Sequence, residues 1–244
     1  MIISFGHFKG GTGKTTSCLN IAGYLARFGS RVLAMDLDPQ SNLTTGLGIE
    51  GEKLEHTIHD VLEKKSTLDR CIISSGINNL DIVPSSTELG KKVKRYRVDS
   101  IKRSLPKVMR RYDFILIDTP PSHRQFISTG VISADKNILV LDPGVFSLAG
   151  IDKYNDIISS NKGEITLGII NGYRRMWNPF ASDPSVEVKK QAETILGAVY
   201  EVPFSRHIYE SQKRGVPISH HKPYSKAGAA YMRIANKILT DSGN

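Results

Sequence analysis

Runs of apolar residues alternate along the chain with longer segments in which apolar and polar residues recur at helical spacing. A continuous apolar run bounded by turn residues predicts a strand covered on both faces, because such a strand has no solvent side. The runs that fit this description are residues 2–5, 31–35, 80–83, 114–117, 137–141 and 165–170. Helical spacing is found in residues 14–28, 56–64, 98–111, 184–196 and 225–239.

Two residues mark where predicted helices end or bend. Gly29 is expected to stop the first helix, since glycine is common just past helix ends. Pro106 is expected to kink or split the helix at 98–111, because proline has no backbone N–H. The positions of the first helix expected to face the core are Leu19, Ala22, Leu25 and Ala26.

Strands that alternate with helices predict an α/β fold, with a mostly parallel central sheet and helices on both faces. With 244 residues, the chain is expected to form a single domain, 1–244. Ligands of such sheets bind at the carboxyl ends of the strands. The motifs that carry chemistry are therefore sought directly after the predicted strands.

Composition argues against a membrane-spanning, secreted or disulfide-bonded protein, and against a metal site built from cysteine and histidine. No apolar run approaches the roughly 20 residues that span a bilayer, and the first eight residues lack the basic region of a signal peptide. Cys18 and Cys71 are expected to be free thiols in a reducing compartment. His220 and His221 are expected to lie in an exposed loop rather than at a metal, because neither a cysteine nor a second histidine pair lies at ligand spacing. The net charge of +9 favours an anionic partner such as nucleic acid.

A glycine-rich segment, GHFKGGTGKTT at residues 6–16, follows the first predicted strand and leads into a helix. Glycines allow the backbone N–H groups to wrap around a polyphosphate, and the helix N-terminus adds positive potential. Lys14 is expected to reach the β- and γ-phosphates, and the Thr15 hydroxyl to bind Mg²⁺. The strict pattern is not met, because Phe8 stands where its first glycine belongs and Lys9 is an additional lysine.

Acidic residues end two later strands. Asp36 and Asp38 alternate and therefore face the same side, where one carboxylate would lie near Mg²⁺ and the other near an attacking water. Asp118 ends the strand at 114–117 and is expected to hold Mg²⁺ through water. The order of phosphate loop and acidic strand ends predicts an ATPase.

These motifs resemble the ParA/MinD family of deviant Walker A ATPases, and within it the ParA/Soj branch. The matching blocks are KGGTGKTT, VLAMDLDPQSNLTTGLG, DIVPSS, YDFILIDTPPS, LGIINGYRR, VPFSRHIYESQKRGVPIS and YSKAGAAYMRIANKIL, at residues 9–16, 32–48, 81–86, 112–122, 167–175, 202–219 and 224–239. The resemblance covers nearly the whole chain.

The resemblance implies a homodimer that sandwiches ATP and Mg²⁺. Lys9 would cross to the phosphates of the partner subunit, and Asp38 would position the attacking water. Asp36, Thr15 and Asp118 would surround the metal. The residues implied to bind ATP are Lys9, Gly10, Gly11, Thr12, Gly13, Lys14, Thr15 and Thr16 at the phosphates, and Asn171, Pro203 and Phe204 near the base.

Members of the branch bind DNA non-specifically as ATP dimers, and a ParB-like protein bound at a centromere stimulates hydrolysis. The resemblance thus implies a cytoplasmic, nucleoid-associated protein that partitions plasmid or chromosome DNA. Basic residues concentrate in 91–111 and in the distal part, where the alternative is a solvated surface. The candidates for DNA contact are Arg174, Arg206, Lys213, Arg214, Lys222 and Lys226.

Three other interpretations stay open. A MinD-like ATPase that cycles on membranes would need a C-terminal amphipathic helix, but the tail 234–244 ends in small polar residues, so no membrane is expected. A positioning ATPase for another cargo would use the same chemistry. An iron–sulfur reductase would need thiolates at a dimer interface, which Cys18 and Cys71 are not placed to supply. The phosphate loop begins too close to Met1 for an N-terminal helix-turn-helix, so binding to an operator is not expected.

Overall fold

The computed structural model describes residues 1–87, 96–121, 123–173 and 184–243. Its described strands form one sheet in the order β3-β4-β2-β5-β1-β6-β7-β8. Only β3 runs antiparallel to its neighbour, β4, and the other pairs are parallel. The strands are β1 (Ile2–Gly6), β2 (Val32–Asp36), β3 (Ile73–Ile77), β4 (Leu80–Val83), β5 (Phe114–Asp118), β6 (Lys136–Leu141), β7 (Ile165–Tyr173) and β8 (Val199–Pro203). The predicted α/β class with a mostly parallel sheet is confirmed.

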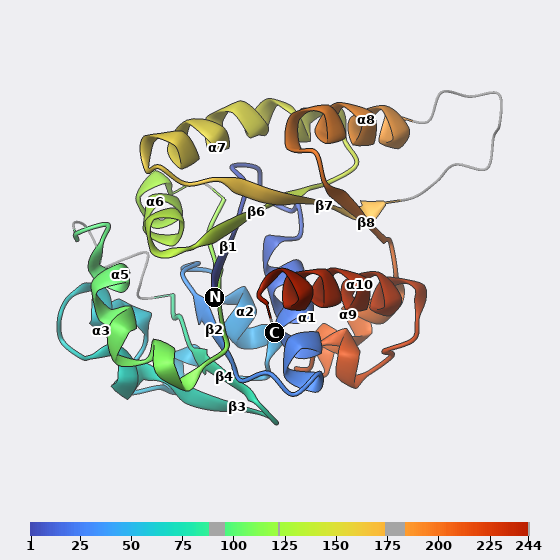
Figure 1. Cartoon of the computed structure of the whole chain (residues 1–244). Helices are drawn as coiled ribbons and strands as arrows, with labels where there is room; N and C mark the ends of the chain where they lie inside the picture. Colours follow the sequence, from blue (N-terminus) through green and yellow to red (C-terminus); the bar gives the residue numbers. More distant parts are fainter. Residues whose placement is uncertain (88–95, 122, 174–183, 244) are drawn as a thin grey trace.

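Helices cover both faces of this sheet (Figure 1). On one face lie α1 (Lys14–Arg27) and α10 (Lys226–Asp241), with α2 (Asn42–Gly46) and α9 (Arg206–Lys213) beside them. The helices of the other face are α3 (Ile58–Leu62), α5 (Ser100–Ser104), α6 (Arg124–Ser133), α7 (Ala149–Ser160) and α8 (Pro184–Leu196). Single 3₁₀ turns are η1 (Gly51–Lys53), η2 (Leu68–Cys71), η3 (Leu105–Lys107), η4 (Met109–Arg111), η5 (Val145–Ser147) and η6 (Ile218–His220).

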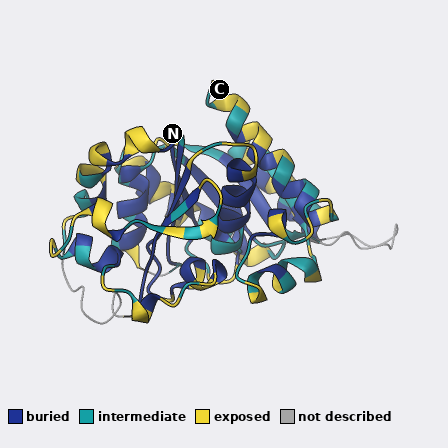
Figure 2. Ribbon diagram, turned by 90° about the horizontal axis from the view of Figure 1, so that it is seen from below, coloured by how far each residue is buried: buried dark blue, intermediate teal, exposed yellow. Residues whose placement is uncertain are grey.

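The core follows the apolar runs of the sequence. Every residue of β1, β2 and β5 is buried, which explains why these strands show no alternation of polar and apolar residues. The four positions of α1 predicted to face the core, Leu19, Ala22, Leu25 and Ala26, are all buried. Figure 2 shows the buried strands at the centre and the exposed residues along the outer sides of the helices. Cys18 and Cys71 are buried free thiols.

Two predicted helices differ from the structure. The segment 98–111 breaks at Pro106 into α5 and the turns η3 and η4, since proline cannot donate within a helix. The helix predicted at 56–64 is shorter, α3, and begins at a capping box made by Thr57 and Asp60.

The parallel register aligns the carboxyl ends of the three central strands. In the pairing of β2 with β5, Asp36 lies opposite Asp118, and in that of β1 with β5, Phe5 lies opposite Asp118. The loop that follows Gly6 therefore starts beside both acidic strand ends. The predicted motifs meet at one edge of the sheet.

We expect Leu25→Ala to lower the free energy of unfolding by about 2–5 kcal/mol, because it removes a fully buried side chain from α1. Ile195→Ala is the matched control, since it shortens an aliphatic side chain that is 54% exposed on α8; its cost should stay below about 1 kcal/mol. Chemical denaturation of both variants measures the difference, and equal losses would contradict the assignment of Leu25 to the core.

Candidate functional site

The glycine-rich loop between β1 and α1 is shaped by left-handed backbone positions. Gly11 has φ 77° and Gly13, the N-cap of α1, has φ 91°. Residues other than glycine rarely adopt such backbone angles, so the loop requires glycine at both positions. The first turn of α1 contains no acidic residue, and its N-terminal N–H groups remain open to an anion.

Lys14 lies almost fully buried at the start of α1. Its Nζ donates a hydrogen bond to the Lys9 carbonyl at 3.0 Å, so the side chain curls back over the loop. Burial lowers the pKa of Lys14, while the negative charges of Asp118 and Asp38 oppose this shift. The ammonium thus stands inside the loop that would enclose a phosphate.

Thr15 and Asp118 form the pair expected around a magnesium ion. The Thr15 hydroxyl donates to Asp118 Oδ2 at 2.6 Å. Asp118 is fully buried, and its other oxygen, Oδ1, has no hydrogen-bond partner among the described residues. Burial, followed by the nearby charge of Asp36, raises the pKa of Asp118 well above its usual value. A buried oxygen without a partner beside a hydroxyl fits a water-coordinated Mg²⁺, which prefers such hard ligands.

Asp36 and Asp38 occupy different environments although they are neighbours. Asp36 is fully buried, and its oxygens accept hydrogen bonds from Asp38 N at 3.0 Å and from Thr44 N and Oγ1 at 2.9 and 2.7 Å. These bonds connect the end of β2 to α2, so Asp36 stabilises the turn between them. That Asp36 also lies near the metal stays a prediction. Burial raises its pKa to about 6.

Asp38 lies on the turn that Asp36 holds. Its Oδ1 accepts a hydrogen bond from Gln40 N at 2.9 Å, and its side chain lines the cavity described next. The structure therefore brings Asp38 to the same space as the phosphate loop, as a residue that positions water must be.

A cavity of about 490 Å³ opens at the N-terminus of α1. Of its lining, Gln40, Asn42 and Gln212 were not singled out from the sequence. Gln212, on α9, donates from Nε2 to Thr16 Oγ1 at 3.1 Å, across 196 positions of the chain. The lining residues are Gly11, Gly13, Lys14, Thr15, Thr16, Asp38, Gln40, Asn42, Thr45, Gly46, Pro121 and Gln212.

The residues expected near the base come from the other side of the loop. Asn171 in β7 accepts a hydrogen bond from the Tyr231 hydroxyl at 3.1 Å and lies directly against Gly13. Pro203 ends β8, and Phe204 after it is 60% exposed. These three do not line the cavity, so their contact with a base stays a prediction.

Lys9 is bound to residues of its own subunit. Its side-chain Nζ forms an ion pair with Asp142 Oδ2 at 2.5 Å, and its backbone N–H donates a hydrogen bond to His7 Nδ1 at 3.0 Å. The other nitrogen of His7 lies 2.9 Å from the Ser147 carbonyl, and burial lowers the pKa of His7 to about 4, so the ring is neutral at pH 7. The crossing of Lys9 to a second subunit stays a prediction.

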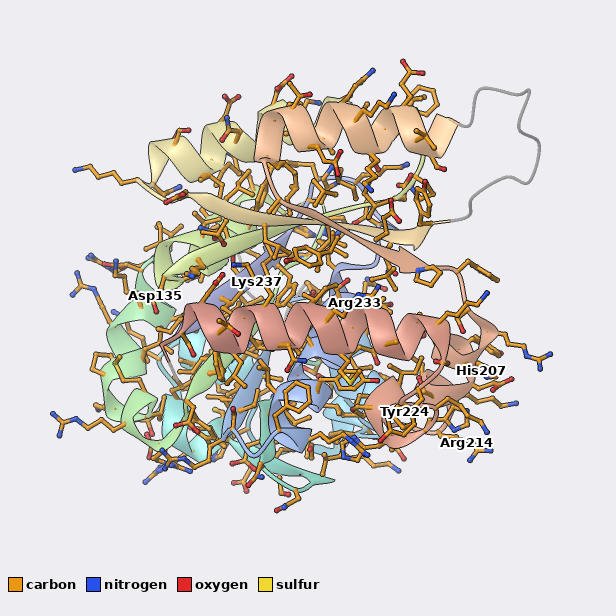
Figure 3. The ribbon with its side chains drawn as sticks, turned by 45° about the vertical axis from the view of Figure 1, so that its right-hand side comes forward. Asp135, His207, Arg214, Tyr224, Arg233 and Lys237 are labelled. Carbon is orange, nitrogen blue, oxygen red and sulfur yellow. The ribbon has the colours of Figure 1, made fainter. Side chains whose placement is uncertain are left out.

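The distal candidates for DNA contact gather on one side of the molecule. Arg206 and Lys213 belong to α9, Arg214 follows it, and Lys222 and Lys226 lie around the start of α10. All five side chains are exposed, and Figure 3 shows Arg214, His207 and Tyr224 at this end of the molecule. Arg174 and the first part of the 91–111 cluster lie outside the described residues.

A glycine-shaped loop that opens a helix, a buried lysine within it and a hydroxyl–carboxylate pair at the strand ends define a P-loop nucleotide-binding site. The acidic side chain lining the cavity adds the means to orient a water. The fold and the site together are those of a P-loop ATPase.

Comparison with known proteins gives the family. Residues 1–166 match the family described as AAA domain. The chain is 30% identical to the chromosome-partitioning ATPase Soj of Treponema pallidum, over 96% of this chain and 95% of that protein. It is 28% identical to the sporulation initiation inhibitor protein Soj of Bacillus subtilis, over 98% of each. The septum site-determining protein MinD of Pyrococcus horikoshii, complexed with Mg-ADP, has a TM-score of 0.84 at 28% identity, over 99% of this chain and 97% of that one.

The chain belongs to the ParA/MinD family of P-loop ATPases. It is an ATPase, and its cofactors are ATP and Mg²⁺. Within the described part of the chain, no helix has both the length and the apolar character needed to cross a bilayer.

Gly13→Ala should weaken ATP binding at least about tenfold. A methyl group there would stand 1.8 Å from Asn171 Nδ2, and the φ of 91° costs an L-residue about 1–2 kcal/mol. Gly29→Ala is a matched control, because its φ is also positive (96°) but a Cβ at Gly29 meets no atom within 4 Å. Calorimetric titration with ATP and Mg²⁺ tests this, and unchanged affinity in Gly13→Ala would refute the geometry.

Proposed function

We propose that this ATPase partitions DNA. In this proposal an ATP-bound homodimer binds DNA without sequence preference, and a ParB-like protein bound at a centromere site stimulates hydrolysis. The protein would then be associated with the nucleoid. The similarity to the relative named as a chromosome-partitioning ATPase supports a function in DNA partitioning. This chain covers almost the whole of that relative.

The observation that carries the proposal is the exposed basic surface formed by Arg206, Lys213, Arg214, Lys222 and Lys226. Tyr209 and Tyr224, which are 69% and 79% exposed, lie among these residues in the sequence. Lysine and arginine on such a surface would neutralise phosphates and release counterions, which gives strong, salt-dependent and sequence-independent binding.

The same surface is linked to the nucleotide site. Gln212 precedes Lys213 and hydrogen-bonds Thr16 beside the cavity. A shift of α9 when nucleotide enters the cavity would move the basic side chains with it. This connection offers a route by which the nucleotide state could change DNA binding.

Each residue of the site has a proposed part in hydrolysis. Lys14 and the N–H groups of the loop bind the phosphates, and Thr15 with Asp118 holds the metal, which neutralises charge on the phosphate oxygens when bound. Asp38 orients the attacking water from the cavity wall. Lys9 contacts the phosphates of the partner subunit after leaving Asp142.

The C-terminal helix argues against a membrane-cycling function. The apolar face of α10 is already packed against α1 and the sheet, so it offers nothing for insertion into lipid. A positioning ATPase for a cargo other than DNA would share the nucleotide chemistry. If it moved on the nucleoid it would bind DNA as well, so the DNA experiment below tests the DNA-bound mechanism and does not identify the cargo.

We expect binding to a non-specific DNA duplex with ATP, and none with ADP or without nucleotide, weakening steeply as salt rises. Lys213→Glu/Arg214→Glu should weaken binding and reduce the slope of log K against log salt by about 2. Lys153→Glu/Lys190→Glu, on exposed positions of α7 and α8, makes the same change of net charge and should bind as the unsubstituted chain does. Absence of DNA binding where the ATP dimer demonstrably forms would exclude partitioning on DNA.

Asp38→Ala should bind ATP with nearly unchanged affinity but hydrolyse it far more slowly, since the side chain that orients water is gone and the loop that holds phosphate is intact. A rate loss of about 10²–10⁴-fold is typical for removal of a catalytic proton acceptor. Single-turnover hydrolysis measured beside nucleotide binding separates the two effects. Loss of ATP binding itself would contradict the assigned role.

A further inference from the structure

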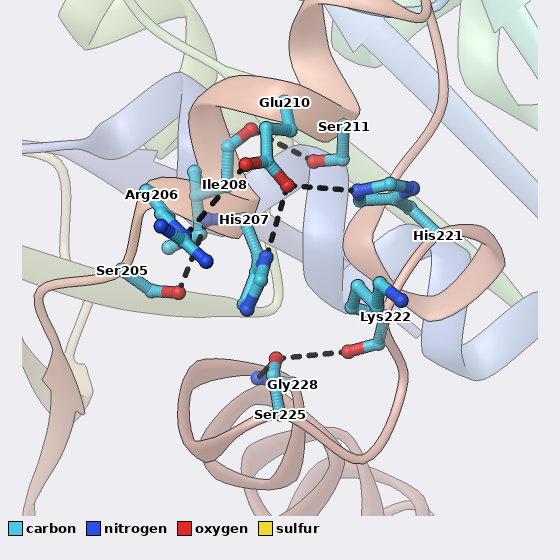
Figure 4. A network of polar contacts seen from close by, with 10 residues as sticks. All are labelled: Ser205, Arg206, His207, Ile208, Glu210, Ser211, His221, Lys222, Ser225 and Gly228. Atoms are coloured by element: carbon cyan, nitrogen blue, oxygen red, sulfur yellow. Dashed lines mark hydrogen bonds and ion pairs between the residues drawn. The ribbon is translucent and has the colours of Figure 1, made fainter.

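Three potential metal ligands meet at the outer side of α9. His207 Nδ1 lies 2.9 Å from Glu210 Oε2, and His221 Nε2 lies 3.2 Å from the same oxygen. One ligand atom from each residue lies within 4.8 Å of the other two. Figure 4 shows both imidazole rings turned towards the carboxylate, from two different segments of the chain.

The spacing of these atoms suits a small divalent ion. Metal–ligand distances of about 2.0–2.2 Å at tetrahedral angles place neighbouring ligand atoms about 3.4 Å apart. The two separations from Glu210 are already close to this value. The two ring nitrogens lie within 4.8 Å of each other, and an ion would draw them to a similar spacing.

Two elements position these three residues: α9 carries His207 and Glu210, and the segment after η6 carries His221. His207 and Glu210 are three residues apart and share a face of α9, whose first turn is capped by Ser205. His221 follows η6, and η6 is tied to α1 because Ile218 N donates to Asn20 Oδ1 at 2.7 Å. The His221 side chain is only 8% exposed, so its position is set by packing.

Charge in the cluster also fits a cation. Glu210 presents a carboxylate oxygen, Oε2, to both imidazole rings. Since a carboxylate only accepts hydrogen bonds, the ring nitrogens that face it carry protons in the metal-free chain. A bound metal would take the place of these two hydrogens.

Arg206 is the charged neighbour that opposes a cation, and it faces the other carboxylate oxygen. Its Nε lies 3.9 Å from Glu210 Oε1, on an exposed side chain. Oε2, between the two histidines, is left to the metal. The arginine therefore weakens the site without occupying it.

We propose that His207, Glu210 and His221 form a binding site for a divalent transition-metal ion, with Zn²⁺ as the ion that this ligand set favours. Two imidazoles and one carboxylate are a common donor set for zinc, and imidazole nitrogens disfavour Mg²⁺ and Ca²⁺. The bound ion would join α9 to the segment after η6. This inference does not depend on DNA binding.

The sequence expectation for His220 and His221 is refined by this geometry. His220 is exposed, as expected, and its Nδ1 lies 2.9 Å from Ser219 Oγ. His221 instead turns inward to residues 11 and 14 positions earlier, a spacing that a search for paired histidines does not detect. His220 thereby provides a control next to the proposed ligand.

The test is titration of the full, chelator-treated chain with Zn²⁺ against a competing chromophoric chelator, without nucleotide. One equivalent should bind, and Co²⁺ should give visible absorption bands typical of a tetrahedral site. Zn²⁺ should also raise the melting temperature, because it binds the folded chain. Glu210→Gln and His207→Ala should each weaken Zn²⁺ binding at least about tenfold and lose the rise in melting temperature.

His220→Ala should bind Zn²⁺ as the unsubstituted chain does. Circular dichroism and ADP binding show that each variant is folded, and both substituted ligands are partly exposed. Failure of the unsubstituted chain to take up one equivalent would overturn the proposal. The proposal would also be overturned if Glu210→Gln and His207→Ala bound Zn²⁺ as tightly as the unsubstituted chain does. A loss of Zn²⁺ affinity in His220→Ala as large as that in the ligand variants would overturn it too.

Discussion

The site depends on carboxylates held out of water at the ends of adjacent parallel strands. Asp36 and Asp118 are fully buried and lie opposite each other in the pairing of β2 with β5. Burial raises the pKa of both carboxyls, and the charge of Asp36 raises that of Asp118 further; a cation or hydrogen bonds relieve this cost. Asp36 has three hydrogen bonds, whereas Asp118 has the Thr15 hydroxyl and the buried ammonium of Lys14 nearby. The Asp118 oxygen that has no hydrogen-bond partner among the described residues is where a metal-bound water would relieve the remaining cost.

The C-terminal third of the chain is attached to the helix that carries the phosphate loop. Besides the bonds of Gln212 and Ile218, Tyr24 of α1 donates to the Pro223 carbonyl at 2.6 Å. The Tyr231 hydroxyl of α10 donates a hydrogen bond to Asn171, and the Asn171 side chain packs against Gly13. Segments some 200 residues apart thus hold α1 from several sides. A displacement at the nucleotide site has a direct structural connection to the basic surface, and to the cluster around Glu210.

Sequence patterns predicted those parts of the fold that are buried on all sides. Strands β1, β2, β4, β5, β6 and β7 were expected from apolar runs, because central strands have no solvent face. Strand β3 was missed, since this edge strand is only half buried and reads as ISSGI. Strand β8 and helices α2, α6, α7 and α9 were missed as well; β8 is, like β3, an edge strand that is only partly buried and gives no continuous apolar run.

The candidate site was predictable where a motif is contiguous, and not where distant segments meet. The loop at residues 9–16 and the acidic strand ends were found from local spacing. Gln212 and Asn42 reach the cavity only through the packing of α9 and α2, which the sequence does not encode locally. The same limit hid the meeting of His207 with His221.

The ion pair between Lys9 and Asp142 bears on how easily a dimer could form. The Lys9 side chain is 37% exposed and that of Asp142 20% exposed, so water screens their attraction, and exposed pairs contribute about 0.2–1 kcal/mol. Burial pushes the pKa of Asp142 upward, but hydrogen bonds from Lys9, Ser147 and the Gly144 N–H outweigh this and hold it below its usual value. The carboxylate thus keeps two of its three partners after Lys9 leaves. In the proposed dimer, exchange of this contact for the phosphates of a partner's ATP would be favourable, because charge-assisted bonds to phosphate are stronger than a partly exposed ion pair. The structure accordingly holds Lys9 in place in the single subunit without fixing it there.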